Sequence, residues 1–569
     1  MKRLIAATLA CLALAACSAI PTSGPVEKGV TDVSAPNDFS PILPGPTPGA
    51  TPTAIVQGFL TAASGGSVNG FDVAREYLTP AASSGWDPLA QVTVFDSREV
   101  FLGFDEAKRT ATYKVPVAAR VNADGVLVEA SSDEQSTLEF TVTTDNDGNS
   151  RISGLDDGIV MSAADFARYY RPVKLLFVSK DNATLVPELR WFPSNDQIAT
   201  ATARELVKGP SPWLADAVNT GFPPGSSLNV DAVVVENGVA KVTLAAGSAG
   251  DAAQRSLAAE QLRLTLTQLP SVQEVVTTVG ALPLAGDDSA APKVAALPDE
   301  RAAVIADGRL GMWNGDKVEV TPADVGVVPV GASGLALSYD AKRVAMVVNG
   351  SIVTSTALSD AHVLEAPPAN PDAPGGPVVP TKTIVEGRNL VAPSFDLRGW
   401  LWTTETLSDG TITVAGPDGA VTQLAAPQLE GRTIQALAVS RDGARVAVLS
   451  RASGVQVLEV MAVVRGSAGE PLALGATLAL GPAVPDSIDL AWLDDVSVAA
   501  LGADSSRISV VAVGGWTTDV TAPVGAMSIA ARNGVPTLLA VGEGDTLVAR
   551  YGNDWKIQAS NVSEVAFAG

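Results

Sequence analysis

The side chains that most often carry chemistry in proteins are scarce in this chain, which narrows the functions open to it. Its 569 residues include one histidine, His362, and two cysteines, Cys11 and Cys17. These counts leave almost no room for Ser-His-Asp triads, Cys-His pairs or zinc sites built on several histidines. His362 lies just before a proline-rich run, which favours a solvated loop residue. We therefore expect no metal site, no cofactor and no enzymatic activity.

Cys17 is the residue whose surroundings point most clearly to chemistry. A short positive segment, Met1-Lys2-Arg3, precedes an apolar stretch from Leu4 to Leu14, which is too short to cross a bilayer because that takes about 20 residues. The sequence Leu14-Ala15-Ala16-Cys17 follows and resembles the bacterial lipobox. The resemblance implies cleavage after a signal peptide of residues 1–16, with S-diacylglycerol and N-acyl groups on Cys17. Two chains of the thioether-linked lipid are enough for stable anchoring in the cell membrane.

Composition and charge describe the part that follows the anchor. Hydrophobic residues make up 46% of the chain and charged residues 17%, which is typical of globular domains. The formal net charge of -23 would repel the phosphates of nucleic acid and the headgroups of an anionic membrane. We therefore expect no nucleic-acid partner, and a membrane contact made through the lipid alone. Cys11 leaves with the signal peptide, so the mature chain has no intrachain disulfide.

A tether and a first folded region follow. Residues 17–53 are rich in Pro, Gly, Ser and Thr and show no periodicity, which predicts a flexible tether. Residues 54–168 begin with helical spacing over Ala54 to Leu60 and Phe71 to Tyr77. Strand patterns come next, over Gln91 to Phe95, Thr110 to Val121 and Ser136 to Thr144. Helices followed by a meander predict an α+β roll, similar to cystatin-like folds.

The second region, residues 169–285, shows the order ββαββαβ. Ser194 and Gln197 match a capping box at the start of a helix that ends at Gly209-Pro210. Asn237-Gly238 between apolar runs predicts a tight hairpin. A second helix is expected from Asp251 to Leu269 and a last strand over Val272 to Val279. The pattern resembles the GerMN domain of sporulation and germination proteins. The residues that carry this resemblance are Arg190, Glu205-Leu206, Gly209-Pro210, Pro224-Gly225, Leu228, Asn237 to Val242, Gln261 and Thr265 to Thr267.

The third region, residues 290–569, shows short strand patterns and almost no helix signals. A small or aromatic residue, any residue and an aspartate recur before an apolar run. The clear copies are Ser338-Tyr339-Asp340, Ser394-Phe395-Asp396 and Ser440-Arg441-Asp442, and the weaker ones are Pro298-Asp299-Glu300, Trp492-Leu493-Asp494 and Arg532-Asn533-Gly534. Their spacing suits the blades of a propeller, with turn residues at a tight hairpin in each blade. We expect about six blades, with five or seven as alternatives, and we expect Val562 to Phe567 to pair with the first blade.

Several acidic and aromatic groups have a structural and a functional interpretation. Asp145 to Asn149 could suggest calcium, but the spacing fails the EF-hand pattern and favours a hairpin turn. Asp494-Asp495 is the most suggestive carboxylate pair, although adjacent residues on a strand point to opposite faces. Six tryptophans lie in the third region, and packing between blades is the favoured role. They are Trp313, Trp400, Trp402, Trp492, Trp516 and Trp555.

The whole chain resembles the LpqB family of actinobacterial lipoproteins. The resemblance rests on the order of the parts and on the start of the mature chain, Cys17-Ser18-Ala19-Ile20-Pro21-Thr22-Ser23-Gly24-Pro25-Val26. It implies a multidomain protein on the extracytoplasmic face of the cell membrane: an α+β roll, a GerMN-like domain and an all-β propeller. It also implies an accessory regulator that contacts the extracytoplasmic part of the MtrB sensor histidine kinase and tunes the MtrA–MtrB pathway, which affects cell-wall maintenance and division.

Two other functions stay open on the residues alone. A propeller glycosidase would need only two carboxylates. A lipoprotein that binds cell-wall glycan or a small solute could use Trp400 and Trp402, which would share one face of a strand.

Overall fold

The computed structural model describes residues 43–569, except 97–99, 132, 146, 230–232, 249, 281, 285–291, 293, 323–324, 359–377, 482–485 and 505. All described residues belong to one compact unit, Pro41–Gly569. The predicted signal peptide, Cys17, most of the predicted tether and His362 lie outside the described residues. Within the described part of the chain, no helix is both long enough and apolar enough to span a membrane.

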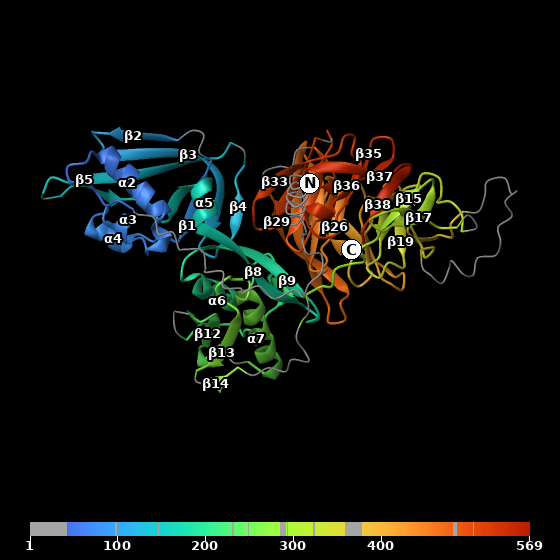
Figure 1. Cartoon of the computed structure of the whole chain (residues 1–569), viewed down its shortest axis with the longest axis horizontal. Helices are drawn as coiled ribbons and strands as arrows, with labels where there is room; N and C mark the ends of the chain where they lie inside the picture. The colour runs from blue at the N-terminus through green and yellow to red at the C-terminus, as the bar shows by residue number, and fades with distance from the viewer. Residues whose placement is uncertain are drawn as a thin grey trace, which may run out of the picture. The chain divides into compact units, whose positions relative to one another are not determined.

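The first region opens with helix α2, Pro52–Ser64 (Figure 1). It begins two residues before the predicted domain boundary, because the Thr51 side chain caps the N–H of Ala54 and Pro52 takes a first-turn position where its missing N–H costs nothing. The chain before α2 is also held in place, since the Tyr77 hydroxyl donates to the carbonyl of Pro44 at 2.9 Å. The end of the predicted tether therefore packs on the first region. Three shorter helices are α3 (Asp72–Arg75), α4 (Pro80–Gly85) and α5 (Ala163–Tyr169).

A seven-stranded sheet lies beside these helices. Its strands are β1 (Gln91–Phe95), β2 (Phe101–Asp105), β3 (Thr110–Asn122), β4 (Leu127–Glu129), β5 (Gln135–Thr144), β6 (Ser150–Gly154) and β7 (Ile159–Ser162). The long strand β3 pairs with β5 along its first half and with β1 along its second half. Apolar residues of α2, including Ile55 and Phe59, share a core with Val94 and Ile152 of the sheet. The Asp145-to-Asn149 segment connects β5 to β6 and makes the predicted hairpin turn, with the Asp145 N–H bonded to the Asn149 carbonyl.

The second region has two sheets and two helices. The elements are β8 (Tyr170–Ser179), β9 (Leu185–Pro193), α6 (Ile198–Lys208), β10 (Val218–Asn219), β11 (Val234–Glu236), β12 (Val239–Leu244), α7 (Ala252–Leu266), β13 (Glu274–Val279) and β14 (Leu282–Pro283). Strands β10-β8-β9 form one sheet and β11-β12-β13-β14 the other. Leu206 of α6 and Leu262 of α7 are fully buried in one core with Leu175 of β8 and Val242 of β12. The predicted order ββαββαβ is confirmed, with β10 and β14 added.

Local signals in this region gave one correct prediction and one wrong one. The hairpin between β11 and β12 turns at Asn237 and Gly238, both with positive φ, as a tight turn of this kind requires. The predicted capping box at Ser194 is wrong, because α6 is capped at Gln197 and no side chain bonds to its first turn. The N–H of Ser194 instead bonds to the carbonyl of Tyr169 and continues the pairing of β8 and β9. Tertiary pairing therefore overrides the local signal.

Six four-stranded sheets make up the third region in the described part of the chain. Each sheet is one blade, and its strands are given from inner to outer. Blade 1 contains β38 (Val562–Ala566), β15 (Ala302–Ala306), β16 (Arg309–Trp313) and β17 (Val318–Val320); blade 2 contains β18 (Ser333–Leu337), β19 (Val344–Val348), β20 (Ser351–Ser355) and β21 (Lys382–Val385); and blade 3 contains β22 (Ser394–Phe395), β23 (Leu401–Thr403), β24 (Thr411–Ala415) and β25 (Val421–Ala425). Blade 4 contains β26 (Thr433–Val439), β27 (Arg445–Ala452), β28 (Val455–Arg465) and β29 (Pro471–Ala479); blade 5 contains β30 (Ser487–Trp492), β31 (Ser497–Gly502), β32 (Arg507–Ala512) and β33 (Thr517–Thr521); and blade 6 contains β34 (Ser528–Ala530), β35 (Leu539–Gly542), β36 (Thr546–Tyr551) and β37 (Asp554–Ala559).

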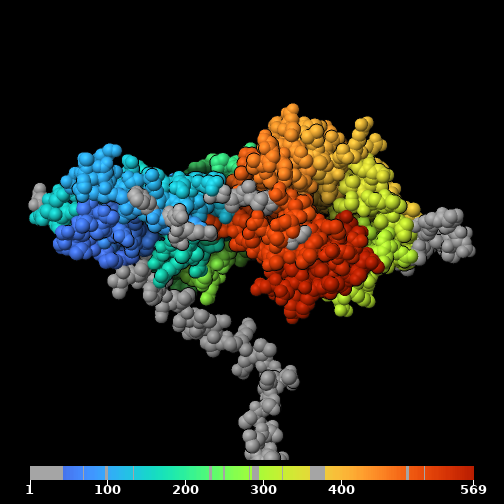
Figure 2. Space-filling view, turned by 90° about the horizontal axis from the view of Figure 1, so that it is seen from above, coloured from blue at the N-terminus to red at the C-terminus, as the bar shows by residue number. Residues whose placement is uncertain are grey.

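The two ends of this region meet in blade 1. Strand β38 pairs antiparallel with β15, which confirms the prediction made from Val562 to Phe567. It also contacts the inner strands of blades 2 and 6, so that the six inner strands follow one another around a common centre. In Figure 2 the red surface of the last residues borders the yellow-green surface of blade 1. Pairing the last strand with the first leaves no inner strand without a neighbour.

In blades 2 to 5, the recurring aspartate motif forms the turn between the first and second strands. In blade 4 the Ser440 hydroxyl donates to Asp442, which also accepts the N–H of Ala444 at 2.9 Å. The Ser440 oxygen in turn accepts the N–H of Arg445. Blade 2 repeats the same bonds around Ser338 and Asp340. Each motif thus satisfies the turn's own N–H groups with side-chain oxygens, which is the physical reason for its recurrence.

Candidate functional site

The residues singled out for catalysis or sugar binding have structural roles. Asp494 lies in the turn between β30 and β31 and accepts the N–H of Val496, while Asp495 forms an ion pair with Lys174 of the second region. Trp402 is 0% exposed and its indole N–H donates to Asp396 at 3.2 Å. It cannot stack on a sugar, so the hypothesis of a platform formed with Trp400 is wrong.

A polar site joins the second region to the propeller. Its centre is the turn between β8 and β9, Ser179 to Thr184, which repeats the bonding of the propeller turns. The Ser179 hydroxyl donates to Asp181 at 2.6 Å, and its oxygen accepts the N–H of Thr184 at 3.0 Å. Asp181 also accepts the N–H of Ala183. The same Ser-x-Asp arrangement therefore occurs on both sides of the contact.

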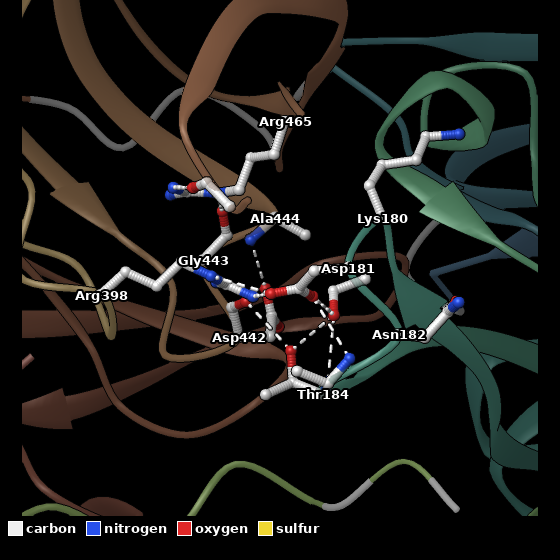
Figure 3. A network of polar contacts seen from close by, with 12 residues as sticks. Lys180, Asp181, Asn182, Thr184, Arg398, Asp442, Gly443, Ala444 and Arg465 are labelled. Atoms are coloured by element: carbon white, nitrogen blue, oxygen red, sulfur yellow. Dashed lines mark hydrogen bonds and ion pairs between the residues drawn. The ribbon is translucent and has the colours of Figure 1, made fainter. Parts of the chain in front are cut away.

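Figure 3 shows Asp181 and Thr184 of this turn directed at Arg398 and Asp442 of the propeller, whereas Lys180 and Asn182 point away from them. Arg398, in the first turn of blade 3, donates from Nε to Asp181 Oδ2 at 3.0 Å and also bonds through Nη2. The Thr184 hydroxyl lies 3.4 Å from the carbonyl oxygen of Asp442 in blade 4. Burial alone would raise the pKa of Asp181, but the Ser179 hydroxyl and the Arg398 guanidinium outweigh it and hold this pKa below its usual value. Asp181 is therefore a carboxylate at neutral pH.

Two buried arginines support the propeller side of the contact. Arg445 pairs with Asp442, with side chains 1% and 4% exposed, and donates to the carbonyls of Pro187 and Asp495. Arg465 pairs with Asp396 and donates to the carbonyls of Gly443 and Gly469. The arginines hold adjacent turns in one geometry, because a planar guanidinium presents donors in fixed directions. We name the set Asp181, Thr184, Arg398, Asp442, Arg445 and Arg465 the junction network.

An aromatic cluster joins the first region to the same side of the propeller. The ring of Trp516, from the turn before β33, lies 5.9 Å from Phe166, whose ring lies 5.1 Å from Trp191. The indole N–H of Trp191 donates to the Gly514 carbonyl at 3.0 Å. Thr517 donates its N–H and its hydroxyl to Glu129 of β4. Trp516 thus departs from the prediction of packing between blades, whereas Trp492 fulfils it by sharing a core with residues of blades 4 and 5.

A central cavity of about 280 Å³ is lined by all six inner strands. Two carboxyl groups face it. Asp489 of β30 accepts the N–H of Ile529, and Glu564 of β38 accepts the N–H of Leu335. Each acceptor lies on one inner strand and each donor on the next, so the carboxyl groups join neighbouring blades. Burial raises the pKa of both groups, that of Asp489 to about 6 and that of Glu564 with a further contribution from the Asp489 charge. Within the described residues, no three His, Cys, Asp or Glu side chains are placed to hold a metal ion.

A known family model matches part of each of the three regions. Residues 45–167 match the model described as Lipoprotein LpqB, N-terminal domain. Residues 173–280 match the model described as Sporulation and spore germination. Residues 373–565 match the Lipoprotein LpqB beta-propeller domain.

Curated relatives match most of the chain. Lipoprotein LpqB of Thermobifida fusca is 30% identical over 568 residues, which covers 87% of this chain and 87% of the relative. Lipoprotein LpqB of Streptomyces coelicolor is 27% identical and covers 95% and 92%.

Solved structures resemble single regions. TolB from Acinetobacter baumannii matches 47% of this chain and 66% of its own with a TM-score of 0.34 and 14% identity. The tandem GerMN domains of GerM from Bacillus subtilis match 22% and 48% with a TM-score of 0.18 and 18% identity. The length and identity of the match to the Thermobifida fusca relative show that the chain belongs to the lipoprotein LpqB family.

Proposed function

We propose that this lipoprotein is held on the extracytoplasmic face of the cell membrane by acyl groups on Cys17, and that it is a non-catalytic accessory regulator. Its partner would be the extracytoplasmic domain of an MtrB-like sensor histidine kinase, in a pathway linked to cell-wall maintenance and division. Family membership supports the lipoprotein part of the proposal. The kinase as partner rests on what is implied by resemblance to the family.

One observation about the propeller supports a binding role. Strands alternate in direction within a blade, so the turns between strands one and two and between three and four lie on one face, and the remaining connections lie on the other. The hydrogen bonds and ion pairs described above between the propeller and the other two regions all come from the first face. The connections of the second face carry exposed apolar side chains: Val330 at 95%, Leu407 at 66%, Val524 at 79% and Met527 at 52%. We name this second face the outer face.

Exposed apolar side chains around the mouth of a rigid ring suit a protein partner better than a small substrate. Apolar side chains near the centre of an interface contribute most of its affinity, with charged residues at the rim. Acidic residues on the same connections, including Glu405 and Glu543, would speed association with a basic partner surface. The outer face is therefore where we place the kinase contact.

The test is direct binding between the purified kinase domain and the chain without residues 1–17. Val524→Glu and Met527→Glu should each weaken binding by tenfold or more, because a charge in an apolar contact costs at least about 1.4 kcal/mol. Ile557→Glu is the matched control, since Ile557 is 68% exposed on the outer strand β37. Capture of the kinase from membranes by the same chain gives a second measurement.

Three outcomes would contradict the proposal. The first is that the kinase domain does not bind the chain at all. The second is that it binds Val524→Glu, Met527→Glu and Ile557→Glu with equal affinity. The third is that it binds only at low salt, as a non-specific charge contact would. Capture of glycan fragments in place of a kinase would favour the alternative function.

That alternative, binding of cell-wall glycan or a solute, is favoured by one feature of the second region. A groove of about 1120 Å³ is lined by α6, the start of α7 and the connection between them. It combines the cations Arg204 and Lys208 with Phe222, Pro223 and Pro224. Titration of glycan fragments against the chain, with the exposed groove residue changed in Arg204→Gln as the variant, tests this function. Saturable binding that the substitution abolishes would support it.

A further inference from the structure

A hollow between blades 2 and 3 has features that the proposed function does not use. It measures about 170 Å³ and is lined by both blades. It opens on the face opposite the outer face, because its lining includes the turn between the last two strands of blade 3, residues 416–419. Its polar side chains are Arg343, Thr354, Lys382 and Asp418. Sites for whole drug-sized molecules usually measure about 300–1,000 Å³, so this one suits a single ionic group.

Arg343 is held in position and still has free donors. Its guanidinium lies over the ring of Phe395, 5.3 Å from the centroid, and its Nη2 donates to the carbonyl of Gly399 at 2.8 Å. Among the residues that the structure describes, its side chain makes no other hydrogen bond and no ion pair. A guanidinium carries five N–H donors, so most of those of Arg343 are left for another acceptor.

The matching arginine of blade 4 shows what this position binds when it is covered. Arg343 and Arg445 both stand five residues after the serine of the recurring motif. Arg445 also lies over a ring of the next blade, 5.0 Å from the centroid of Trp492. It pairs with Asp442 and donates to the carbonyl of Pro187, which belongs to the second region. Arg343 has neither kind of acceptor, and the hollow lies where one would be.

Two further side chains distinguish the matching blades. Thr354 of β20 lies opposite Lys382 of β21 in the pairing of blade 2. The pairing of blade 4, followed from its own motif arginine, has Val460 and Leu478 at these two places. Both belong to the apolar core between blades 4 and 5. In blade 2 a hydroxyl and an ammonium group replace them, which indicates a role other than packing.

We propose that this hollow binds a phosphate group, either as the free ion or as a monoester. Arg343 and Lys382 would neutralise its charge, and the Thr354 hydroxyl would donate to one of its oxygens. A phosphate monoester carries about −1.5 to −2 charges at pH 7 and three acceptor oxygens, which matches two cations and a hydroxyl better than a carboxylate does. Asp418, the one carboxylate among the described lining residues, accepts the N–H of Ala420 at 3.0 Å within its own turn.

The test is calorimetric titration of the chain lacking residues 1–17 with inorganic phosphate and with glycerol 3-phosphate, at constant ionic strength. Acetate is the matched anion with a single charge, and it should bind at least tenfold more weakly than phosphate. Binding of both phosphates would assign the group in either form, and binding of inorganic phosphate alone would assign the free ion.

The variants give blade 2 the side chains of blade 4, so that packing between the blades is kept. Lys382→Leu should weaken phosphate binding at least tenfold, because a charge-assisted contact is lost. Thr354→Val should weaken it by a smaller factor, since a neutral hydrogen bond contributes less. Arg388→Gln is the control, because Arg388 is an exposed cation after β21 that does not line the hollow.

Three results overturn the inference. They are no binding of either phosphate up to about 10 mM, equal binding of acetate, and unchanged phosphate binding in Lys382→Leu. Circular dichroism checks that each variant is folded. None of these outcomes depends on the kinase contact, which is measured separately.

Discussion

The contact between Asp181 and Arg398 can be tested apart from the turn in which Asp181 lies. Oδ1 of Asp181 accepts from Ser179 and Ala183 within its own turn, whereas Oδ2 accepts from Arg398. Asp181→Asn keeps one oxygen that can accept the bonds of the turn. It replaces Oδ2 with an NH₂ group, which is a donor and faces the guanidinium of Arg398. The substitution therefore removes the contact with Arg398 and leaves the hairpin in place.

The expected cost follows from burial. Both side chains of this pair are 16% exposed, which places the pair between a surface ion pair, at about 0.2–1 kcal/mol, and a fully buried pair that loses one partner, at about 3–5 kcal/mol. We expect about 2 kcal/mol. Because the folded pKa of Asp181 lies below its unfolded value, the stabilisation is complete at neutral pH and is lost as the pH falls below about 4.

Hydrogen exchange measured by mass spectrometry is the appropriate assay, because a chain of several domains does not unfold in a single step. Peptides that cover the β8–β9 turn and the first turns of blades 3 and 4 should exchange about 30-fold faster in Asp181→Asn. Asp340→Asn is the matched control, since Asp340 makes the same turn bonds with Ser338 and Lys342. It should leave exchange at the β8–β9 turn unchanged.

Two results would refute this account of the contact. One is unchanged exchange at the β8–β9 turn in Asp181→Asn. The other is an equally large increase in exchange at the blade 2 turn in Asp340→Asn. That result would show that the bonds within such a turn, and not the contact with Arg398, set the exchange rate.

Three further predictions concern the anchor, the aromatic cluster and the central cavity. Cys17→Ala should abolish labelling by radioactive palmitate and release the chain from membranes; labelling that persists would place the lipid elsewhere. Trp516→Ala should lower the opening free energy of the first region by about 3 kcal/mol as measured by hydrogen exchange, because the ring packs on Phe166 and Trp191; a change below 1 kcal/mol would contradict this packing. Burial raises the pKa of Asp489 from 3.8 to about 6, so its ionisation opposes folding and stability should fall as the pH rises between these values, by at most about 3 kcal/mol. Asp489→Asn should remove that pH dependence from the opening free energy of the propeller, measured by hydrogen exchange at pH 4 and 7 after correction for the intrinsic exchange rates. An unchanged difference between the two pH values would show that other groups cause it.

The propeller shows which features of the fold a single sequence can predict. Ser338-x-Asp340 and Ser440-x-Asp442 satisfy their own turns with their own side chains, so the motif determines the local structure wherever it occurs. Counting its copies predicted about six blades, and the alternation of Val562 to Phe567 predicted the last pairing. The capping box at Ser194 failed because its N–H bonds to Tyr169, a partner that only the folded hairpin brings near.

The junction network was not predicted, although one signal for it is present in the sequence. Ser179-Lys180-Asp181 has the same pattern as the propeller turns, in a region where no blade was expected. Its partner Arg398 lies more than two hundred residues later, and no local pattern pairs residues at that separation. The burial of Trp402 confirms the favoured prediction of packing between blades, because it shares a core with residues of blades 3 and 4. Alternation along a strand could not by itself rule out the sugar platform, because it does not distinguish a solvent face from a contact between blades.

The chemistry of the junction network bears on how this lipoprotein would regulate a partner. Buried ion pairs such as Arg445 with Asp442 add little net stability once the cost of desolvation is counted. Separating the two groups is nevertheless strongly destabilising, because it leaves a buried charge without a partner. A junction made of them therefore fixes orientation more than it adds affinity. The aromatic cluster around Trp516 supplies apolar contact beside it. If the partner binds the outer face of the propeller, a fixed orientation of the second region keeps that face and the surface of the second region in one constant arrangement. Loosening the junction with Asp181→Asn should then reduce kinase regulation without removing kinase binding, and equal loss of both would show that the contact only stabilises the fold.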